Sequence, residues 1–167
     1  MNQELAIRII ADGAVIPVVL IGIYALVFKI PKSQRFDAYK RILMAGLTAY
    51  LLAKLIGSIY QPSSSRPFEI LGASAGASFL NNPGFPSDHT LFLTAIACAA
   101  WFETRQVLIT LILVSLVFIV SVGRVMALVH TPADVIGGIV IALIGSVWYL
   151  GSKYRFANLK IALPIKK

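Results

Sequence analysis

Long uninterrupted apolar runs constrain this chain more than any other feature of its sequence. Hydrophobic residues make up 58% of the 167 residues and charged residues only 13%, and the apolar residues follow one another without amphipathic spacing. A bilayer core takes about 20 apolar residues per helix. The runs that approach this length cover residues 5–28, 41–60, 88–102, 106–128 and 133–152, the third being short. The sequence therefore predicts an all-α, polytopic membrane bundle of about five transmembrane helices.

The same runs argue against other classes of protein. They occupy most of the polypeptide, so we expect one integral-membrane domain over residues 1–167 and no separate soluble domain. A β-barrel would need alternating apolar and polar residues. The first run carries Arg8 and Asp12 and lacks a clear cleavage signal, which favours a retained helix over a signal peptide. Cys98 is the single cysteine and cannot form an internal disulfide.

The net charge of +8 comes largely from two segments of the chain, the first connection and the tail. Their basic residues are Lys29, Lys32, Arg35, Lys40 and Arg41, then Lys153, Arg155, Lys160, Lys166 and Lys167. This pattern is typical of cytoplasmic loops of membrane proteins and favours contact with anionic lipid over nucleic acid. We therefore expect a multi-pass protein of the inner (cytoplasmic) membrane with a cytoplasmic C-terminus. The long connection 61–86 and the connection after Arg124 then lie outside.

This topology gathers the chemically reactive residues on one side of the membrane. Both histidines of the sequence interrupt apolar runs, and each lies close to a carboxylate. The side chains expected on the extracytoplasmic side are Arg66, Ser87, His89, Arg124, His130 and Asp134. Two histidines placed on the side that also holds two arginines have little structural purpose in a membrane protein, so we interpret them as functional.

Two predicted helix starts add a binding site for an anion. Ser87 has the character of an N-cap residue, and Thr131 followed by Pro132 has that of an N-cap and first helical position. The unpaired amides and positive dipole ends of two helices would then face outward. Arg66 and Arg124 add planar guanidinium groups suited to phosphate oxygens. The segment is therefore predicted to bind phosphate.

Phosphoryl transfer to an imidazole needs a nucleophile, a group that orients it, positive charge around the phosphate and an acid for the leaving oxygen. His130 is the candidate nucleophile, Asp134 would hold its other ring nitrogen, and His89 would protonate the leaving group. The groups expected to stabilise the transition state are Arg66, Arg124, Ser87 and nearby backbone amides. This chemistry requires no metal or other cofactor, and the two histidines lack a recognisable metal-ligand spacing.

Three segments in this order resemble a known family. They are RPF at Arg66 to Phe68, PSDH at Pro86 to His89, and Arg124 followed by His130 and Asp134. Together they resemble the signature motifs of the type 2 phosphatidic acid phosphatase superfamily, over residues 54–138. The resemblance implies an integral-membrane, metal-independent phosphatase that acts through a phosphohistidine.

The motif GFPSDHT at Gly84 to Thr90 and HTPADVIGG at His130 to Gly138 are similar to one subgroup, the bacterial undecaprenyl-diphosphate phosphatases of the bacitracin-resistance type. This similarity implies hydrolysis of undecaprenyl diphosphate to undecaprenyl phosphate and inorganic phosphate, for cell-envelope biogenesis. Phosphatidic acid and phosphatidylglycerophosphate remain alternative substrates. An anion-binding or transport membrane protein without catalysis is the alternative of another class, and the oligomeric state stays open.

Lys54 departs from the family pattern, which usually has a lysine seven residues before the arginine of the RP motif. Position 59 is Ile, and Lys54 lies twelve residues before Arg66. A lysine inside a membrane helix is costly and is a functional candidate by default, so Lys54 joins the predicted phosphate site. The alternative is an ion pair with Asp12. The family also often has six helices, one more than expected here.

Several candidates also have a purely structural interpretation. Asp134 could only complete a capping box with Thr131, and Arg124 could only complement a helix C-terminus. Asp88 is counted with the phosphate site by its position in the motif, although a carboxylate repels phosphate and a favourable first-turn acid is the simpler interpretation. A serine hydrolase built on Ser87 is disfavoured because the GxSxG nucleophile elbow is missing.

The connection 61–86 is long and contains several apolar side chains. These are Phe68, Ile70, Leu71, Phe79 and Leu80. We expect them to form a short interfacial helix that covers the site and admits an isoprenoid or acyl tail from the outer leaflet.

Overall fold

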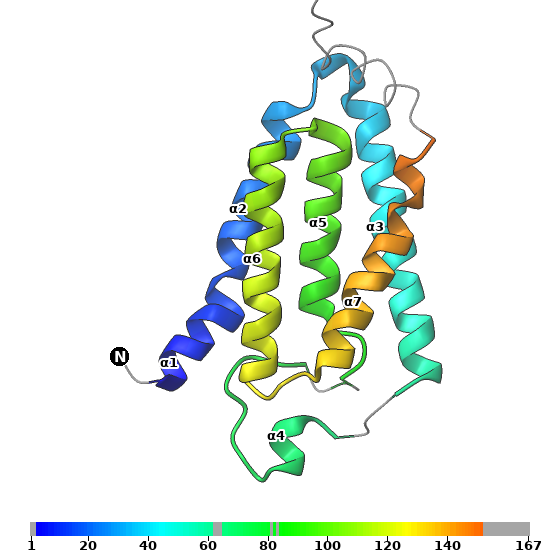
Figure 1. Ribbon diagram of the computed structural model, residues 1–167. Helices are drawn as coiled ribbons and strands as arrows, with labels where there is room; N and C mark the ends of the chain where they lie inside the picture. The colour runs from blue at the N-terminus through cyan, green and yellow to red at the C-terminus, as the bar shows by residue number, and fades with distance from the viewer. Residues whose placement is uncertain (1–2, 62–64, 81, 83, 152–167) are drawn as a thin grey trace, which may run out of the picture.

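The computed structural model describes residues 3–61, 65–80, 82 and 84–151, and over these residues the chain is helical, with no strand. The first apolar run forms one interrupted rod, and the remaining helices follow (Figure 1). The elements are α1 (Gln3–Arg8), the π-helical turn η1 (Ile9–Gly13), α2 (Val15–Tyr24), the π-helical turn η2 (Ala25–Lys29), the 3-10 turn η3 (Lys32–Gln34), α3 (Arg35–Ile59), α4 (Pro67–Ile70), α5 (Asp88–Thr104), α6 (Val107–Met126), α7 (Pro132–Gly145) and the 3-10 turn η4 (Ser146–Tyr149).

Four helical segments among the described residues are long and apolar enough to cross a membrane. They are Glu4–Lys29, Lys32–Ile59, Val107–Met126 and Pro132–Tyr149. The fifth long helix, α5, has 17 residues and is the run that the sequence marks as short. The expected all-α membrane bundle is confirmed, with four full-length segments around one shorter helix.

Helix α3 begins earlier than the sequence suggests, at Arg35. Arg35, Lys40 and Arg41 therefore lie on the helix and not in a connection. Pro31 stands between the two rods and cannot continue the first one. The guanidinium of Arg35 donates from Nη2 to the carbonyl oxygen of Val27 (2.7 Å) and from Nε to that of Ile30 (3.3 Å), which satisfies free carbonyls at the end of the first rod. The basic tail lies outside the described residues.

Helix α5 is the centre of the bundle and contacts α2, α3, α6 and α7 (Figure 1). Its buried face consists largely of small side chains, with Ala97, Ala99 and Ala100 at 5% exposure or less. Small residues at helix interfaces let backbones approach closely, which is how membrane helices gain packing energy without a hydrophobic driving force between them. The apolar side chains that face outward, such as Leu108 and Phe118 on α6, are correspondingly exposed.

Glycines on α7 set the closest of these approaches. A Cβ added at Gly138 would lie 2.7 Å from the carbonyl oxygen of Ser87 and 3.0 Å from the amide nitrogen of Leu91. One at Gly145 would lie 2.6 Å from the carbonyl oxygen of Ala45 on α3. The α7 backbone therefore lies directly against the first turn of α5 and the middle of α3.

The end of the bundle that holds the first connection is closed by a different interaction. Arg41 on α3 donates from Nε and Nη2 to the two carboxylate oxygens of Glu103 on α5, at 2.7 and 2.6 Å. Phe102 and Tyr149 stack beside this pair with ring centroids 5.1 Å apart. The last turn of α5 is thus held to α3 by a pair of charged hydrogen bonds.

The Gly138→Ala variant should destabilise the protein, because the added methyl group meets backbone atoms that cannot move aside. We expect a loss of about 1–3 kcal/mol, the usual cost of overpacking, measured by thermal unfolding in detergent. Gly46→Ala is the matched control, since a Cβ at Gly46 meets nothing within 4 Å and alanine favours a helix over glycine. Equal stability of the two variants would contradict the close approach.

Candidate active site

The two histidine segments meet at one end of the bundle, where α5 and α7 both begin (Figure 1). The backbone amide of Ser87, the N-cap residue of α5, donates to the carbonyl oxygen of Asp134 in the first turn of α7 at 2.9 Å. Ser87 itself is fully buried, and its hydroxyl accepts a hydrogen bond from Thr90 at 3.1 Å. Two helix N-termini are therefore joined side by side. Ser87 and Thr131 are the N-cap residues that the sequence indicates, but only Thr131 caps its helix through its side chain.

His130 and Asp134 lie at the start of α7. Thr131 is the N-cap residue: its hydroxyl accepts from the amide of Asp134 at 3.2 Å, and the Asp134 carboxylate accepts from the amide of Thr131 at 2.7 Å. The same carboxylate oxygen lies 3.6 Å from Nδ1 of His130, longer than a hydrogen bond. Asp134 thus completes the capping box, and the same carboxylate also faces the ring nitrogen.

The environment of His130 favours a neutral imidazole. The residue is 5% exposed, and burial is the main cause that lowers the pKa of His130 below its usual value. The positive charges of Arg124 and Arg66 act in the same direction, while Asp134 opposes them. Only the neutral ring has a free nitrogen lone pair, so His130 is kept in the form that can act as a nucleophile.

Arg124 is the most deeply buried charge among the described residues, with 1% of its side chain exposed. Its Nη1 donates to Asp12 on η1 at 2.8 Å, and its Nη2 donates to the carbonyl oxygen of Ser78 at 2.7 Å. Its Nε has no hydrogen-bond partner among the described residues, and neither has Nδ1 of His130. Buried donors of this kind are costly unless a ligand or water satisfies them.

Arg66 is also buried, at 7% exposure, and lies in the long connection. Its Nη1 donates to the carbonyl oxygen of Val129 at 2.5 Å, and its Nη2 contacts the carbonyl oxygens of Leu80 and Asn82 and the side-chain oxygen of Asn82 at 2.9–3.2 Å. Arg66 therefore ties the connection 66–82 to the segment that carries His130. Several of its donors are already engaged by the protein.

His89 follows Asp88 in the first turn of α5. It is partly buried, and the charges that act on it include those of Arg124 and Asp12. The structure thus brings His89, His130 and Arg124 within electrostatic reach of one another, from three different helices or connections.

Lys54 and Asp88 form a pair at the edge of the site. The ammonium of Lys54 lies 3.4 Å from a carboxylate oxygen of Asp88, and both side chains are partly exposed. The alternative that Lys54 pairs with Asp12 is wrong, because Lys54 pairs with Asp88 and Asp12 binds Arg124 instead. Lys54 precedes Arg66 by twelve residues instead of the seven usual in the family. At this position it lies beside the first turn of α5.

The connection between α3 and α5 covers this end of the bundle (Figure 1). Of the five apolar residues expected in a short helix there, only Phe68 and Ile70 lie in one, α4, which is one turn long and begins directly after Arg66. Leu71, Phe79 and Leu80 lie outside a helix. The amides of Phe68 and Gly76 donate to the carbonyl oxygens of Leu128 and Ala127, both at 3.0 Å, so the cover is bound to the connection between α6 and α7. Leu71, Leu80 and other apolar side chains of the cover are exposed.

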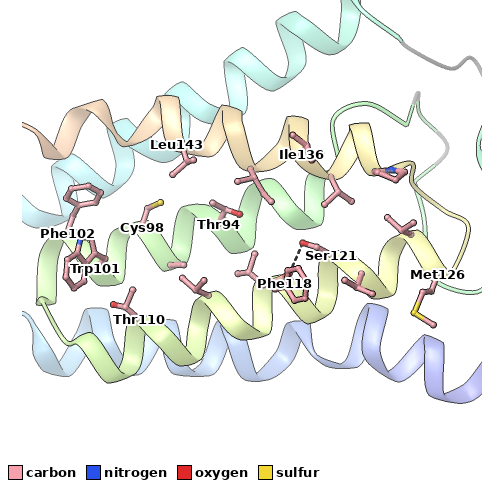
Figure 2. A pocket seen from close by; sticks show the side chains of 18 residues that line it. Thr94, Cys98, Trp101, Phe102, Thr110, Phe118, Ser121, Met126, Ile136 and Leu143 are labelled. Atoms are coloured by element: carbon pink, nitrogen blue, oxygen red, sulfur yellow. Dashed lines mark hydrogen bonds between the residues drawn. The ribbon is translucent and has the colours of Figure 1, made fainter.

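A long apolar groove of about 790 Å³ runs along α5 between α6 and α7. Its lining is almost entirely apolar. Figure 2 shows Met126 at the end near the start of α7 and Trp101 and Phe102 at the other end, with Phe118 and Ile136 on the two walls. The groove therefore extends from the neighbourhood of the site through the span of the bundle.

Three polar side chains that contact the site, those of Asp12, Asn82 and Gln61, are absent from the site predicted from the sequence. Asp12 binds Arg124, Asn82 binds Arg66, and the side-chain amide of Gln61 donates to the carbonyl oxygen of Phe85 at 3.2 Å. Only Asp12 carried a signal in the sequence, since a carboxylate in an apolar run is costly. No group of three or more potential metal ligands occurs among the described residues.

Comparison with known proteins gives a family and one relative. The family model described as the PAP2 superfamily matches residues 33–157. The chain is 28% identical over 150 residues to "Undecaprenyl-diphosphatase BcrC" of Bacillus subtilis (strain 168), covering 90% of this chain and 72% of the relative. No solved structure matches this chain.

Proposed function

We propose, from the premise that this chain belongs to the PAP2 superfamily, that it is a membrane phosphatase that hydrolyses undecaprenyl diphosphate to undecaprenyl phosphate and inorganic phosphate. The observation that carries the proposal is the junction of two helix N-termini that holds a buried His130 beside Asp134 and a buried Arg124 with an unpaired Nε. Amide groups at helix starts and a guanidinium nitrogen together suit the oxygens of a phosphate.

In the first chemical step, Nε2 of His130 attacks the terminal phosphorus. A nitrogen–phosphorus bond forms as the bond to the bridging oxygen breaks, and His89 donates a proton to that leaving oxygen. The charge that develops on the phosphoryl oxygens is stabilised by Arg124 and the backbone amides at the starts of α5 and α7. The products are undecaprenyl phosphate and phosphohistidine.

In the second step, water attacks the phosphohistidine. His89, now without its proton, takes a proton from the water as the new oxygen–phosphorus bond forms and the nitrogen–phosphorus bond breaks. Inorganic phosphate leaves and His130 returns to its neutral form. Asp134, 3.6 Å from Nδ1, stabilises the positive charge that the ring carries while it is phosphorylated.

The placement of basic residues supports an active site on the extracytoplasmic side. Lys29 and Lys32 lie at the end of the bundle opposite to the site, as do the first residues of α3 (Figure 1). Positive residues mark the cytoplasmic end of membrane helices. The site then faces the outer surface of the cytoplasmic membrane, where a lipid diphosphate would present its headgroup.

The apolar groove supports a lipid substrate over a soluble phosphate ester. Its volume of about 790 Å³ falls within the range of about 300–1,000 Å³ that ligand pockets span. We propose that it takes the first part of the hydrocarbon tail, while the phosphates remain at the helix starts. A pocket of about 350 Å³ beside Lys54 and Asp88, between α3 and α5, is the alternative route for the tail.

The test of the function is phosphate release by the detergent-purified protein in EDTA, with undecaprenyl diphosphate and phosphatidic acid as separate substrates. We expect release from both lipids or from the diphosphate alone, at a higher kcat/KM for the diphosphate. His130→Ala should lower kcat at least about a thousandfold, as the loss of a nucleophile does. Lys40→Ala, a change on the exposed opposite end of the bundle, is the control for purification and folding.

Three results would contradict parts of this proposal. Equal release by folded His130→Ala would remove His130 as the nucleophile. A requirement for a divalent cation would remove the metal-independent mechanism. A higher kcat/KM for phosphatidic acid would replace the substrate while leaving the phosphatase.

The proposed tail site predicts a substrate-dependent effect of filling the groove. Val122→Trp, which places a large ring in the groove, should raise KM for the lipid diphosphate about tenfold or more, since a pocket filled by its own side chain loses the contacts of the tail. Hydrolysis of a short-chain phosphate ester should be unaffected. Ile119→Trp is the matched control, because Ile119 lies on the same helix, is 43% exposed against 41% for Val122, and does not line the groove. Unchanged KM in Val122→Trp would favour the pocket beside Lys54.

A further inference from the structure

We propose that Asp12, in the first membrane rod and outside all three sequence motifs, is a positioning residue for catalysis, because it fixes the guanidinium of Arg124 so that Nε faces the phosphate site. The inference rests on the proposed function, since it concerns how Arg124 contacts phosphate. It assigns a role to the N-terminal rod, which otherwise contributes no residue to the site.

The local backbone brings Asp12 to Arg124. Asp12 lies in η1, a π-helical turn over Ile9–Gly13 that interrupts the α-helical rod between α1 and α2. Wide turns of this kind are rare inside helices and occur often at functional sites. On the facing helix, a Cβ at Gly123 would lie 2.9 Å from the amide nitrogen and 3.0 Å from the Cα of Ala11. Gly123 therefore lets the two backbones touch one residue away from both members of the ion pair.

The contacts form a closed ring of three residues. Asp12 Oδ1 accepts from Nη1 of Arg124 at 2.8 Å, and Asp12 Oδ2 accepts from the backbone amide of Ser78 at 2.9 Å. The carbonyl oxygen of Ser78 in turn accepts from Nη2 of Arg124 at 2.7 Å. The ring joins the N-terminal rod, helix α6 and the connection that covers the site.

This ring fixes the plane of the guanidinium. A guanidinium is planar and carries its five donors in a rigid fork, so engaging both Nη atoms also sets the direction of the Nε–H bond. That Nε is buried and has no partner among the described residues, which leaves one oriented donor for a ligand. Without Asp12, Arg124 would be a buried charge with no counter-ion, an unfavourable state that drives rearrangement.

The same ring also holds the connection between α3 and α5 in position above the site. Ser78 belongs to the same connection as Arg66, which donates to the carbonyl oxygens of Leu80 and Asn82. Asp12 therefore orients a catalytic group and fixes the segment above it through one carboxylate. A role limited to helix packing would need neither the contact to Ser78 nor a free Nε on Arg124.

The experiment is a double-mutant cycle between Asp12→Asn and Arg124→Lys, with kcat and KM for the best lipid substrate and the thermal unfolding midpoint measured for each variant. Asp12→Asn keeps the size of the side chain and removes its charge. We expect it to lower kcat about ten- to a hundredfold with a smaller change in KM, because an oriented donor is worth most in the transition state. In the Arg124→Lys background, where the fork is gone, the same change should cost less than about threefold, the mark of two residues that act as a unit.

Asp37→Asn is the matched control, since Asp37 is an exposed aspartate of another membrane rod and lies 4.0 Å from Lys40 at the opposite end. It should leave kcat unchanged. The inference is overturned if Asp12→Asn retains wild-type kcat, or if it lowers kcat by the same factor with and without Arg124.

Folding is checked by a second variant. If Asp12→Asn alone does not fold, the double variant Asp12→Asn with Arg124→Gln removes both charges. If this double variant unfolds at the wild-type midpoint, the result supports the pairing of Asp12 with Arg124. If it is as unstable as Asp12→Asn alone, the inference is overturned. Failure of the wild-type protein to release phosphate would instead overturn the proposed function, which separates the two results.

Discussion

The close junction between the first turns of α5 and α7 is the constraint on which the site depends. It rests on one backbone hydrogen bond, from Ser87 to Asp134 at 2.9 Å, and on the absence of a side chain at Gly138, which lets the two backbones meet. This contact joins the starts of the two helices and places His130 and His89 at the same end of the bundle. Every other polar group of the site lies around this junction, so its geometry decides what the site can bind.

Charge compensation is the second constraint, because the bundle has a low-dielectric surrounding. Each buried or half-buried cation near the junction has its own partner: Asp12 for Arg124, Asp88 for Lys54, and a set of carbonyl oxygens for Arg66. These partners come from four different segments, and the hydrogen bonds of Arg66 also fasten the cover to the bundle. The arrangement still leaves Nε of Arg124 without a hydrogen-bond partner among the described residues, so one guanidinium N–H group can still donate to an anion.

Features that depend on local sequence could be predicted, and features that depend on packing could not. Apolar runs indicate the helices, and Thr131, Pro132 and Asp134 indicate the start of α7, because capping acts within one turn. The apolar pattern indicates too late a start for α3, because its first turns are charged and are stabilised by hydrogen bonds from Arg35 to the preceding rod. The partners of Lys54 and Arg124 were beyond prediction, since depth in a helix says nothing about which face meets which neighbour. The catalytic roles of His130, His89 and Asp134 remain predictions that the geometry supports.

The central claim is that phosphate passes through a covalent bond to His130, and the most direct measurement is to trap that bond. The protein would be mixed with undecaprenyl diphosphate labelled in its terminal phosphate, quenched in base within one turnover, and mapped by mass spectrometry. We predict one base-stable, acid-labile phosphate on His130 that forms faster than inorganic phosphate is released and is absent from His130→Asn. Turnover without any bound label, or label on another residue such as Ser87, would contradict the mechanism.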